Sequence, residues 1–210
     1  MNAQQSASWV YTEEFARDDP VIDAARRRGH ELGAAPVSAA VGAVLRLLGT
    51  SSRARTAVEI GSGAGVSGLY LLEGMPSDGV LTTIDIEPAH HKAALASFRA
   101  AGVPTQHTRA ICGDALDMLP RLADRGYDLV FIDGDEHEYA QYIDQALRLL
   151  RTDGVLIVHN MLWHGRVADP AARDETTVRL RDLGKELRDD ERLDVTLLPV
   201  GGGLLLGTRN

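Results

Sequence analysis

Three glycines lie close together in the chain, between a short apolar segment and an amphipathic one. They are Gly61, Gly63 and Gly65, and Ser67 follows two residues later. Glycine permits tight turns, and the bare N–H groups at the start of a helix can contact a ligand directly. This stretch therefore predicts that these four residues bind a cofactor. The alternative is that the glycines only shape a turn from a strand into a helix.

Two carboxylates accompany this loop. Glu59 ends the apolar segment before the glycines, where its charge would repel a pyrophosphate and attract the ammonium group of a methionine moiety. Asp85 ends the next apolar segment, where a carboxylate can accept hydrogen bonds from both ribose hydroxyls. Residues 63–68 also match the pattern G-x-G-x-x-G, so a dinucleotide stays an alternative. The two acids favour S-adenosylmethionine, a nucleoside that carries an amino acid and no phosphate.

A third carboxylate, Asp114, follows the next apolar segment and the glycine at position 113. It can accept a hydrogen bond from the exocyclic amine of an adenine, and Asp is also a favoured N-cap for the helix that we expect from residue 115. The two roles are compatible. Glu87 offers a second ribose contact, but Pro88 beside it makes a role at a helix start equally consistent with the sequence.

These residues need a sheet to bring them together, and the pattern of the chain predicts one. Apolar segments alternate with helix candidates, which indicates right-handed crossovers and a parallel sheet covered on both faces. The chain then closes with two strand candidates around three glycines, which predicts an antiparallel hairpin. The expected strands are Thr56–Ile60, Val80–Asp85, Thr108–Cys112, Asp128–Asp133, Gly154–His159, Leu193–Val200 and Leu204–Thr208. The expected helices are 19–33, 37–48, 66–74, 88–101, 115–124, 139–151 and 173–189.

The composition places limits on function. The net charge of −8 argues against general nucleic-acid binding, which needs clustered cations. The single cysteine, Cys112, excludes an internal disulfide and a cysteine-based zinc cluster. No apolar stretch approaches the roughly 18 residues of a membrane helix, and the first residues lack the pattern of a signal peptide. We therefore expect a cytoplasmic protein that binds neither membrane nor nucleic acid.

Several of these segments together resemble one family, the small cation-dependent O-methyltransferases that include the catechol and caffeoyl-CoA enzymes and belong to the class I S-adenosylmethionine-dependent methyltransferases. The resemblance covers roughly residues 36–208 in consistent order. It is carried by Glu59-Ile60-Gly61, Ile84-Asp85-Ile86-Glu87-Pro88, Gly113-Asp114-Ala115, Asp128-Leu129-Val130-Phe131-Ile132-Asp133, Asn160-Met161-Leu162-Trp163 and Leu198-Pro199-Val200-Gly201.

The resemblance implies one α/β domain over residues 1–210 with a Rossmann-like methyltransferase fold. Its sheet would have seven mostly parallel strands and an antiparallel C-terminal hairpin. The N-terminal helices, residues 1–50, would serve the acceptor and a homodimer contact. The implied reaction moves a methyl group from S-adenosylmethionine to a hydroxyl of a small, aromatic acceptor.

The resemblance also assigns roles to residues. The cofactor would be held by Glu59, Gly61, Gly63, Gly65, Ser67, Asp85, Asp114 and Asp133. The family binds a divalent cation with Asp133 and with an Asp-Asn pair at the end of the fifth strand, which here reads His159-Asn160. The family's catalytic lysine falls at Glu136. A nitrogen in place of a carboxylate weakens the case for Mg²⁺ and favours Mn²⁺, Fe²⁺ or Zn²⁺ at Asp133, His159 and Asn160.

Three interpretations of His159 stay open at this point. It can be a metal ligand, a general base in a metal-free site, because imidazole titrates near neutrality, or a structural histidine. Glu136 and His137 are further candidates for the base, or part of a solvated acidic rim. Trp163 can line an aromatic pocket or pack in the core. Two functional alternatives remain, a catalytically silent cofactor-binding module and an NAD-binding oxidoreductase.

Overall fold

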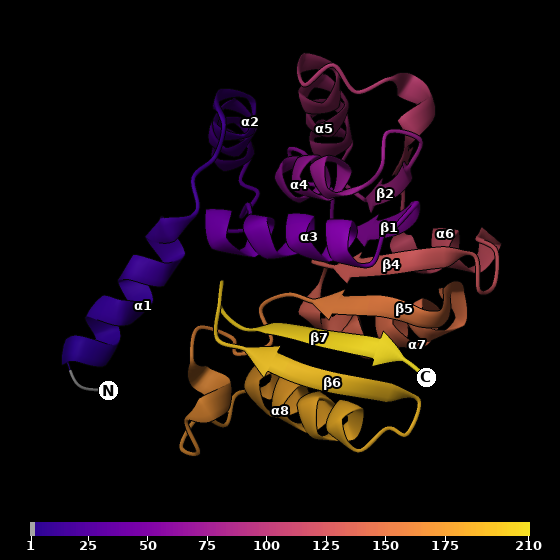
Figure 1. Cartoon of the computed structure of the whole chain (residues 1–210). Coiled ribbons are helices and arrows are strands. Elements are labelled where there is room, and N and C mark those ends of the chain that lie inside the picture. The colour runs from indigo at the N-terminus through magenta and orange to yellow at the C-terminus, as the bar shows by residue number, and fades with distance from the viewer. Residues whose placement is uncertain (1–2) are drawn as a thin grey trace.

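The structure is a computed structural model that describes residues 3–210. Eight α-helices are present in this range (Figure 1): α1 Ala3–Phe15, α2 Pro20–Glu31, α3 Ala39–Ser51, α4 Val66–Gly74, α5 Pro88–Ala100, α6 Ala115–Met118, α7 Tyr139–Leu149 and α8 Glu175–Arg188. The seven strands are β1 Thr56–Ile60, β2 Val80–Asp85, β3 Thr108–Cys112, β4 Tyr127–Ile132, β5 Leu150–Val158, β6 Leu193–Leu198 and β7 Leu204–Arg209.

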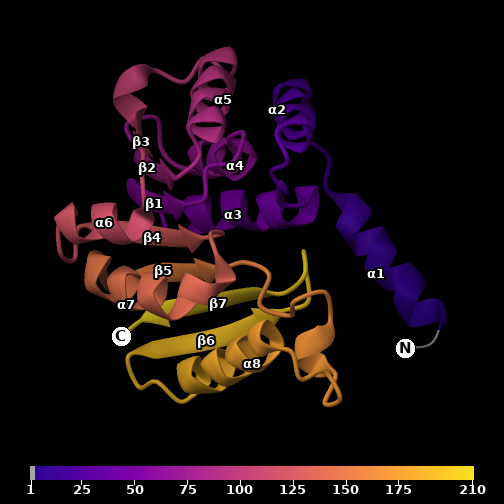
Figure 2. The same ribbon diagram turned by 180° about the vertical axis from the view of Figure 1, so that it is seen from behind.

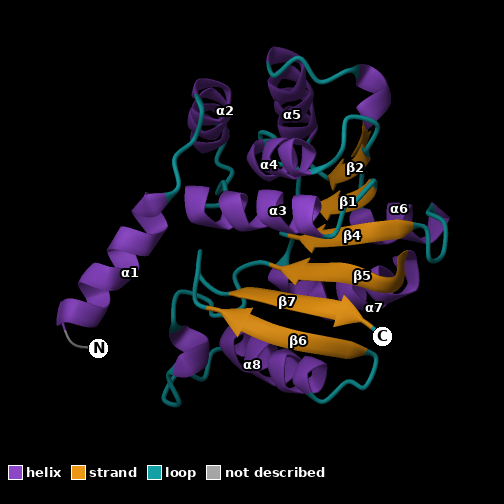
Figure 3. Cartoon of the chain, in the orientation of Figure 1, coloured by secondary structure: helices purple, strands orange, loops and turns teal. Residues whose placement is uncertain are grey.

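The strands form one sheet in the order β3-β2-β1-β4-β5-β7-β6 (Figure 3). Strands β1 to β5 pair in parallel, whereas β7 pairs antiparallel with both β5 and β6. This confirms the predicted α/β fold with a closing antiparallel hairpin. Because the parallel strands all end at the same edge, the acids at the ends of β2 and β4 and the loop after β1 are brought side by side.

Helices cover both faces of the sheet, α2 to α5 on one face and α6 to α8 on the other (Figures 1 and 2). Successive residues of a strand point to opposite faces, and β1 shows this directly. Ala57 packs with the α3 and α4 side, and Val58 packs with the α7 and α8 side. Both are completely buried. Among the described helices, none combines the length and the apolar character that a bilayer crossing requires.

Two boundaries differ most from the sequence prediction. The expected helix 115–124 ends after one turn, and residues 119–121 continue it as a 3-10 turn around Pro120. Strand β5 begins at Leu150 rather than at 154, because its pairing with β4 shifts register between Tyr127 and Leu129. Such an irregularity interrupts the alternation of side chains that marks a strand in sequence.

Helix α1 was not predicted, because its sequence has no apolar face for the core. It extends away from the body of the molecule (Figures 1 and 2), and Trp9, Tyr11 and Phe15 are exposed. Its contact with the body runs through Glu13, which accepts hydrogen bonds from the Ser38 hydroxyl and the Gly201 N–H, both at 2.8 Å. This carboxylate joins the start of α3 to the turn between β6 and β7.

Helices α3 and α4 pack tightly because a glycine faces an aromatic ring. Tyr70 of α4 lies against Gly42 of α3, and a Cβ atom at position 42 would come within 2.2 Å of two ring carbons. The ring is fixed, since the Tyr70 hydroxyl donates a hydrogen bond of 2.7 Å to Asp18. No residue larger than glycine therefore fits at position 42 without a shift of the Tyr70 ring.

We expect Gly42→Ala to destabilise the chain by about 1–3 kcal/mol, the usual cost of overpacking a core. Gly184→Ala is the matched control, because this helical glycine of α8 has only the tip of Met161, at 4.0 Å, near the position of an added Cβ. The control should be neutral or stabilising by up to about 1 kcal/mol. Urea unfolding measures both, and equal stability of the two variants would contradict this packing.

Candidate active site

Two adjoining cavities open at the carboxyl ends of the parallel strands. Their volumes are about 260 Å³ and about 330 Å³, which together suit a ligand of nucleoside size. The first cavity lies between the loop after β1 and the segment before α3, and the second lies over the ends of β2 and β3. Both are lined by Gly61, Asp85, His90, Asp133 and Gly134.

The floor between the cavities depends on Gly61. Its φ is +91°, and a Cβ atom there would lie 2.1 Å from the carbonyl oxygen of Asp133. Only glycine allows the loop after β1 to approach the end of β4 this closely. Gly63 and Ser67 line the first cavity, whereas Gly65 lies against Ala94 of α5 and lines neither cavity.

Glu59 lies beneath this loop rather than in the cavity wall. It is completely buried, and its Oε2 accepts a hydrogen bond of 2.5 Å from the Thr83 hydroxyl, which also bonds Ser62. Its Oε1 is buried without a partner. This position differs from our expectation that Glu59 contacts the methionine ammonium directly. The sequence showed the acid at the strand end but not that its side chain turns into the protein.

Burial raises the pKa of Glu59 to about 7. The hydroxyls of Ser67 and Thr83 oppose this by stabilising the anion, and the nearby charges of Asp133 and Asp85 add to the rise in pKa. A carboxyl group with such a pKa is partly protonated at neutral pH. A cation bound above the loop would favour its ionised form.

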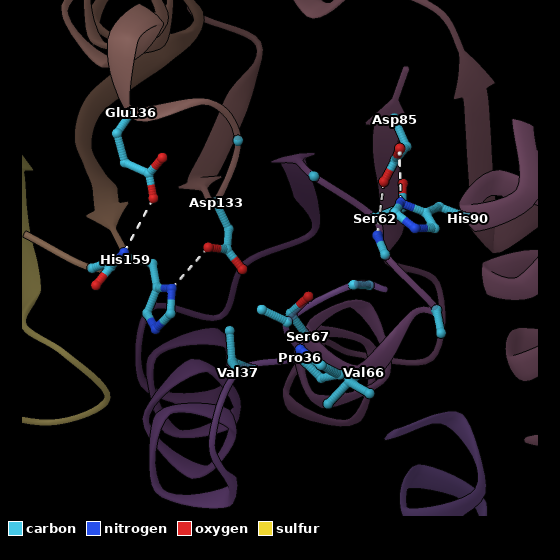
Figure 4. A pocket seen from close by; sticks show the side chains of 17 residues that line it. Pro36, Val37, Ser62, Val66, Ser67, Asp85, His90, Asp133, Glu136 and His159 are labelled. Atoms are coloured by element: carbon cyan, nitrogen blue, oxygen red, sulfur yellow. Dashed lines mark hydrogen bonds and ion pairs between the residues drawn. The ribbon is translucent and has the colours of Figure 1, made fainter. Parts of the chain in front are cut away.

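Asp85 stands at the boundary of the two cavities and is almost fully buried. Its Oδ2 accepts the N–H of Gly63 at 2.8 Å, and its Oδ1 accepts the N–H of Glu87 at 2.9 Å. The His90 ring lies 3.5 Å from Oδ1 (Figure 4). Each carboxylate oxygen can accept a second hydrogen bond, so the group is fixed by the backbone and keeps capacity for a ligand.

The second cavity ends at Asp114 and Tyr142. Asp114 caps α6 by accepting the N–H of Leu116 at 2.8 Å, and it also lines the cavity. The predicted cap is thus confirmed, and the position is compatible with the ligand contact. Glu87 also lines this cavity and starts α5, but its side chain makes no capping bond.

Asp133 and His159 form the far wall of the first cavity. Nδ1 of His159 and Oδ1 of Asp133 are 2.7 Å apart (Figure 4), and Tyr139 donates a hydrogen bond to the His159 carbonyl. The other ring nitrogen, Nε2, is buried without a hydrogen-bond partner. Burial alone would lower the pKa of His159, but the charge of Asp133 and its contact with Nδ1 hold this pKa above its usual value.

Asn160 and Glu136 make a second pair beside Asp133 and His159. Nδ2 of Asn160 donates a hydrogen bond of 3.1 Å to Oε1 of Glu136, drawn as the dashed line at Glu136 in Figure 4. The Asn160 amide oxygen faces Gly202, since a Cβ there would lie 2.8 Å from it. The three predicted metal ligands therefore do not turn their donor atoms toward a common point. Within residues 3–210, no group of three or more His, Cys, Asp or Glu side chains is arranged to hold an ion.

The other candidate residues from the sequence analysis do not line the cavities. His137 lines neither cavity and is exposed, so the structure does not bring it to the site. Trp163 packs against the core cluster on the α7 and α8 face, and neither cavity includes it. The sequence did not point to His90 or to the wall formed by Pro36 and Val37. His90 had a weak signal, because it lies in the first turn of the helix that follows Asp85.

The sheet order, the glycine loop and the acids at the strand ends define a class I α/β methyltransferase fold. The O-methyltransferase family model matches residues 14–210, which is nearly the whole chain. The chain belongs to this O-methyltransferase family and is an S-adenosylmethionine-dependent O-methyltransferase by class. The family excludes the NAD-binding oxidoreductase as an alternative.

Relatives agree with this placement. A Mycobacterium tuberculosis protein named "Probable O-methyltransferase" is 45% identical over 202 residues, which are 96% of this chain and 90% of the relative. A Corynebacterium glutamicum crystal structure matches with a TM-score of 0.90 and 32% identity over 99% of this chain and 97% of that one. The O-methyltransferase TomG from Streptomyces achromogenes, solved in complex with S-adenosylmethionine, matches with a TM-score of 0.86 and 29% identity over the full length of both chains.

The buried Glu59 predicts a pH dependence of stability. Its pKa is raised on folding, from about 4.5 to about 7, so it stabilises the folded chain fully below pH 4.5 and loses this contribution as the pH rises through 7. Glu59→Gln cannot ionise. We therefore expect the free energy of unfolding of this variant, relative to that of the wild type, to increase by about 1–3 kcal/mol between pH 5 and pH 8.

Urea unfolding at several pH values measures this difference. Glu31→Gln, at an exposed position at the end of α2, is the control and should follow the wild type across the range. A constant difference between Glu59→Gln and the wild type at all pH values would contradict the raised pKa.

Proposed function

We propose that this chain transfers a methyl group from S-adenosylmethionine to a hydroxyl oxygen of a small, aromatic acceptor. The observation that carries the proposal is the Asp133–His159 pair at the end of a cavity of cofactor size, with a buried ring nitrogen that has no partner. The complex of the relative TomG with S-adenosylmethionine supports the choice of cofactor.

The residues present suit this cofactor. Gly61, Gly63 and Ser67 would hold its methionine part in the first cavity, and the first-turn N–H groups of α4, which lack helical partners, would donate to its carboxylate. Asp133 would attract its ammonium group. S-Adenosylmethionine, when bound, supplies a methyl group on a positively charged sulfur, which becomes a neutral thioether on transfer.

The adenosine part would occupy the second cavity. Asp85 is held by two backbone N–H groups and would accept the ribose hydroxyls with its remaining lone pairs. Asp114 would accept the adenine amine. Within the described residues, the walls of both cavities contain seven carboxylates and no lysine or arginine. This negative potential suits a cofactor with a net positive charge and disfavours a pyrophosphate.

The acceptor would lie between the apolar wall of Pro36 and Val37 and the polar wall of His159 and Glu136. A flat apolar ring fits against the first wall, and its hydroxyl would face the second. Holding the hydroxyl in line with the methyl group would provide much of the rate acceleration, because the entropy cost of aligning the two reactants is then met on binding.

His159 would take the proton of the acceptor hydroxyl. Asp133 accepts the Nδ1–H, which leaves the Nε2 lone pair as the acceptor of that proton. As the oxygen–carbon bond forms, the proton passes to Nε2 and the bond between sulfur and the methyl carbon breaks. Glu136, held by Asn160, is a second candidate for the base, whereas the position of His137 does not support it.

We infer further that residues 1–210 act as one methyltransferase domain and form a homodimer. The homodimer is supported by the aromatic surface of α1, where Trp9, Tyr11 and Phe15 are exposed on a helix that extends from the body. A second copy of the chain would cover this surface. The first 50 residues would then serve both the acceptor and the dimer.

Asp85→Asn should weaken S-adenosylmethionine binding by about 10- to 100-fold, because an amide nitrogen cannot accept the bonds of the carboxylate it replaces. Isothermal titration calorimetry measures the dissociation constant. Asp117→Asn removes the same charge from an exposed position of α6 and should bind like the wild type. Binding of NAD by the wild type, or unchanged affinity in Asp85→Asn, would contradict the assignment of the cavities.

The reaction is tested with S-adenosylmethionine that carries a deuterated methyl group and a panel of catechols, simple phenols and hydroxycinnamates. His159→Asn is the informative variant, since its amide can still donate to Asp133 but has no atom at the position of Nε2. We expect its kcat to fall by about 10²- to 10⁴-fold, the usual contribution of a general base, while cofactor affinity stays within a few-fold. Mass spectrometry of the products gives the rate, and unchanged turnover in His159→Asn would exclude His159 as the base.

A further inference from the structure

We propose that methyl transfer by this chain requires no divalent cation, because His159 and Asp133 pair with each other where the family binds its metal. The proposal rests on the proposed function for its chemistry. It also concerns the acceptor, since a site without a cation does not need two neighbouring oxygens on the substrate.

The first support is the geometry of the Asp133–His159 pair. The 2.7 Å contact joins Nδ1 of the ring to one carboxylate oxygen, so the nitrogen closest to Asp133 is engaged with it. Only 13% of the His159 side chain and 22% of the Asp133 side chain are exposed. The ring therefore occupies the space beside the carboxylate rather than leaving it for an ion.

The second support is the position of Asn160. Its φ is +57°, and the backbone around it is fixed, because Leu162 donates to the Gly202 carbonyl and Met161 to the Gly203 carbonyl. This holds the amide between Glu136 and the turn before β7, with Nδ2 on the Glu136 carboxylate and the oxygen facing Gly202. The amide oxygen is thus directed away from Asp133.

The third support is that nearby acids are already engaged. Asp135 accepts the N–H of His137 at 2.9 Å, and Glu138 accepts the hydroxyl of Tyr142. Hard cations such as Mg²⁺ need about six oxygen ligands with well-defined geometry. In the part of the chain that the structure describes, no three His, Cys, Asp or Glu side chains are grouped so that they could hold a metal ion.

The pair can perform the two tasks that the cation has in the family. A cation orients the acceptor and lowers the pKa of its hydroxyl. Here the imidazole accepts the proton directly. The acceptor would be oriented by the shape of the cavity, between the apolar wall of Pro36 and Val37 and the polar wall of Glu136. An acceptor with a single phenolic hydroxyl then serves as well as a catechol.

Direct metal binding tests the proposal without any turnover. Wild-type protein saturated with S-adenosylhomocysteine is titrated with Mn²⁺, and free Mn²⁺ is followed by electron paramagnetic resonance. We expect no stoichiometric site in the wild type. His159→Asp restores a carboxylate beside Asp133 and should acquire at least a 10-fold tighter Mn²⁺ site, with folding and cofactor binding confirmed by circular dichroism and calorimetry.

A stoichiometric Mn²⁺ site in the wild type that is lost in Asp133→Asn would overturn the proposal, as would a folded His159→Asp that gains no Mn²⁺ affinity. In the wild type, we expect methyl transfer to change less than twofold with EDTA and to proceed with a monohydroxylated phenol. Transfer that occurs only with added cation would also overturn it. Because Mn²⁺ binding is read without an acceptor, these results stay distinct from a failure of the proposed methyl transfer itself.

Discussion

The close approach of Asp133 to the glycine loop is the contact on which the site depends. The Asp133 N–H donates to the Ile60 carbonyl at 2.9 Å, and its own carbonyl lies so near Gly61 that no other residue fits there. This contact sets the ends of β1 and β4 side by side. From that position the Asp133 carboxylate reaches both cavities and holds His159, so one residue connects the cofactor region with the acceptor region.

The features that follow from topology could be predicted from the sequence. Gly61, Asp85, Asp114 and Asp133 each lie at the end of a parallel strand or just after it. Because parallel strands end at one edge of the sheet, the approximate neighbourhood of these residues was determined once the strands were recognised. The terminal hairpin was recognisable because three glycines separate two short apolar strands. These inferences need only the order and type of elements.

The features that depend on side-chain direction could not be predicted. Glu59 lies at the expected strand end, but its carboxylate points to Thr83 beneath the loop, and only packing decides between the two sides. The pairing of Asn160 with Glu136 joins positions 24 residues apart through one rotamer each. Helix α1 lacked a signal because it is attached mainly through the single carboxylate of Glu13 rather than through an apolar face.

The chain thus keeps the scaffold of its family and changes the residues at the reacting end of the cavity. A carboxylate at the fifth strand end would add negative charge beside Asp133, whereas His159 offers it a hydrogen-bond donor. Glu136 brings negative charge where the resemblance implies a lysine. In our proposal, the site would therefore use an imidazole and carboxylates that suit a positively charged cofactor, rather than a bound ion and an ammonium group.

A crystal structure with S-adenosylhomocysteine and a phenol tests the central claim most directly. We expect the ribose on Asp85, the adenine beside Asp114, and the phenol oxygen within hydrogen-bond distance of Nε2 of His159 and in line with the cofactor sulfur. A nucleoside bound elsewhere, or a phenol whose oxygen lies far from His159, would contradict it.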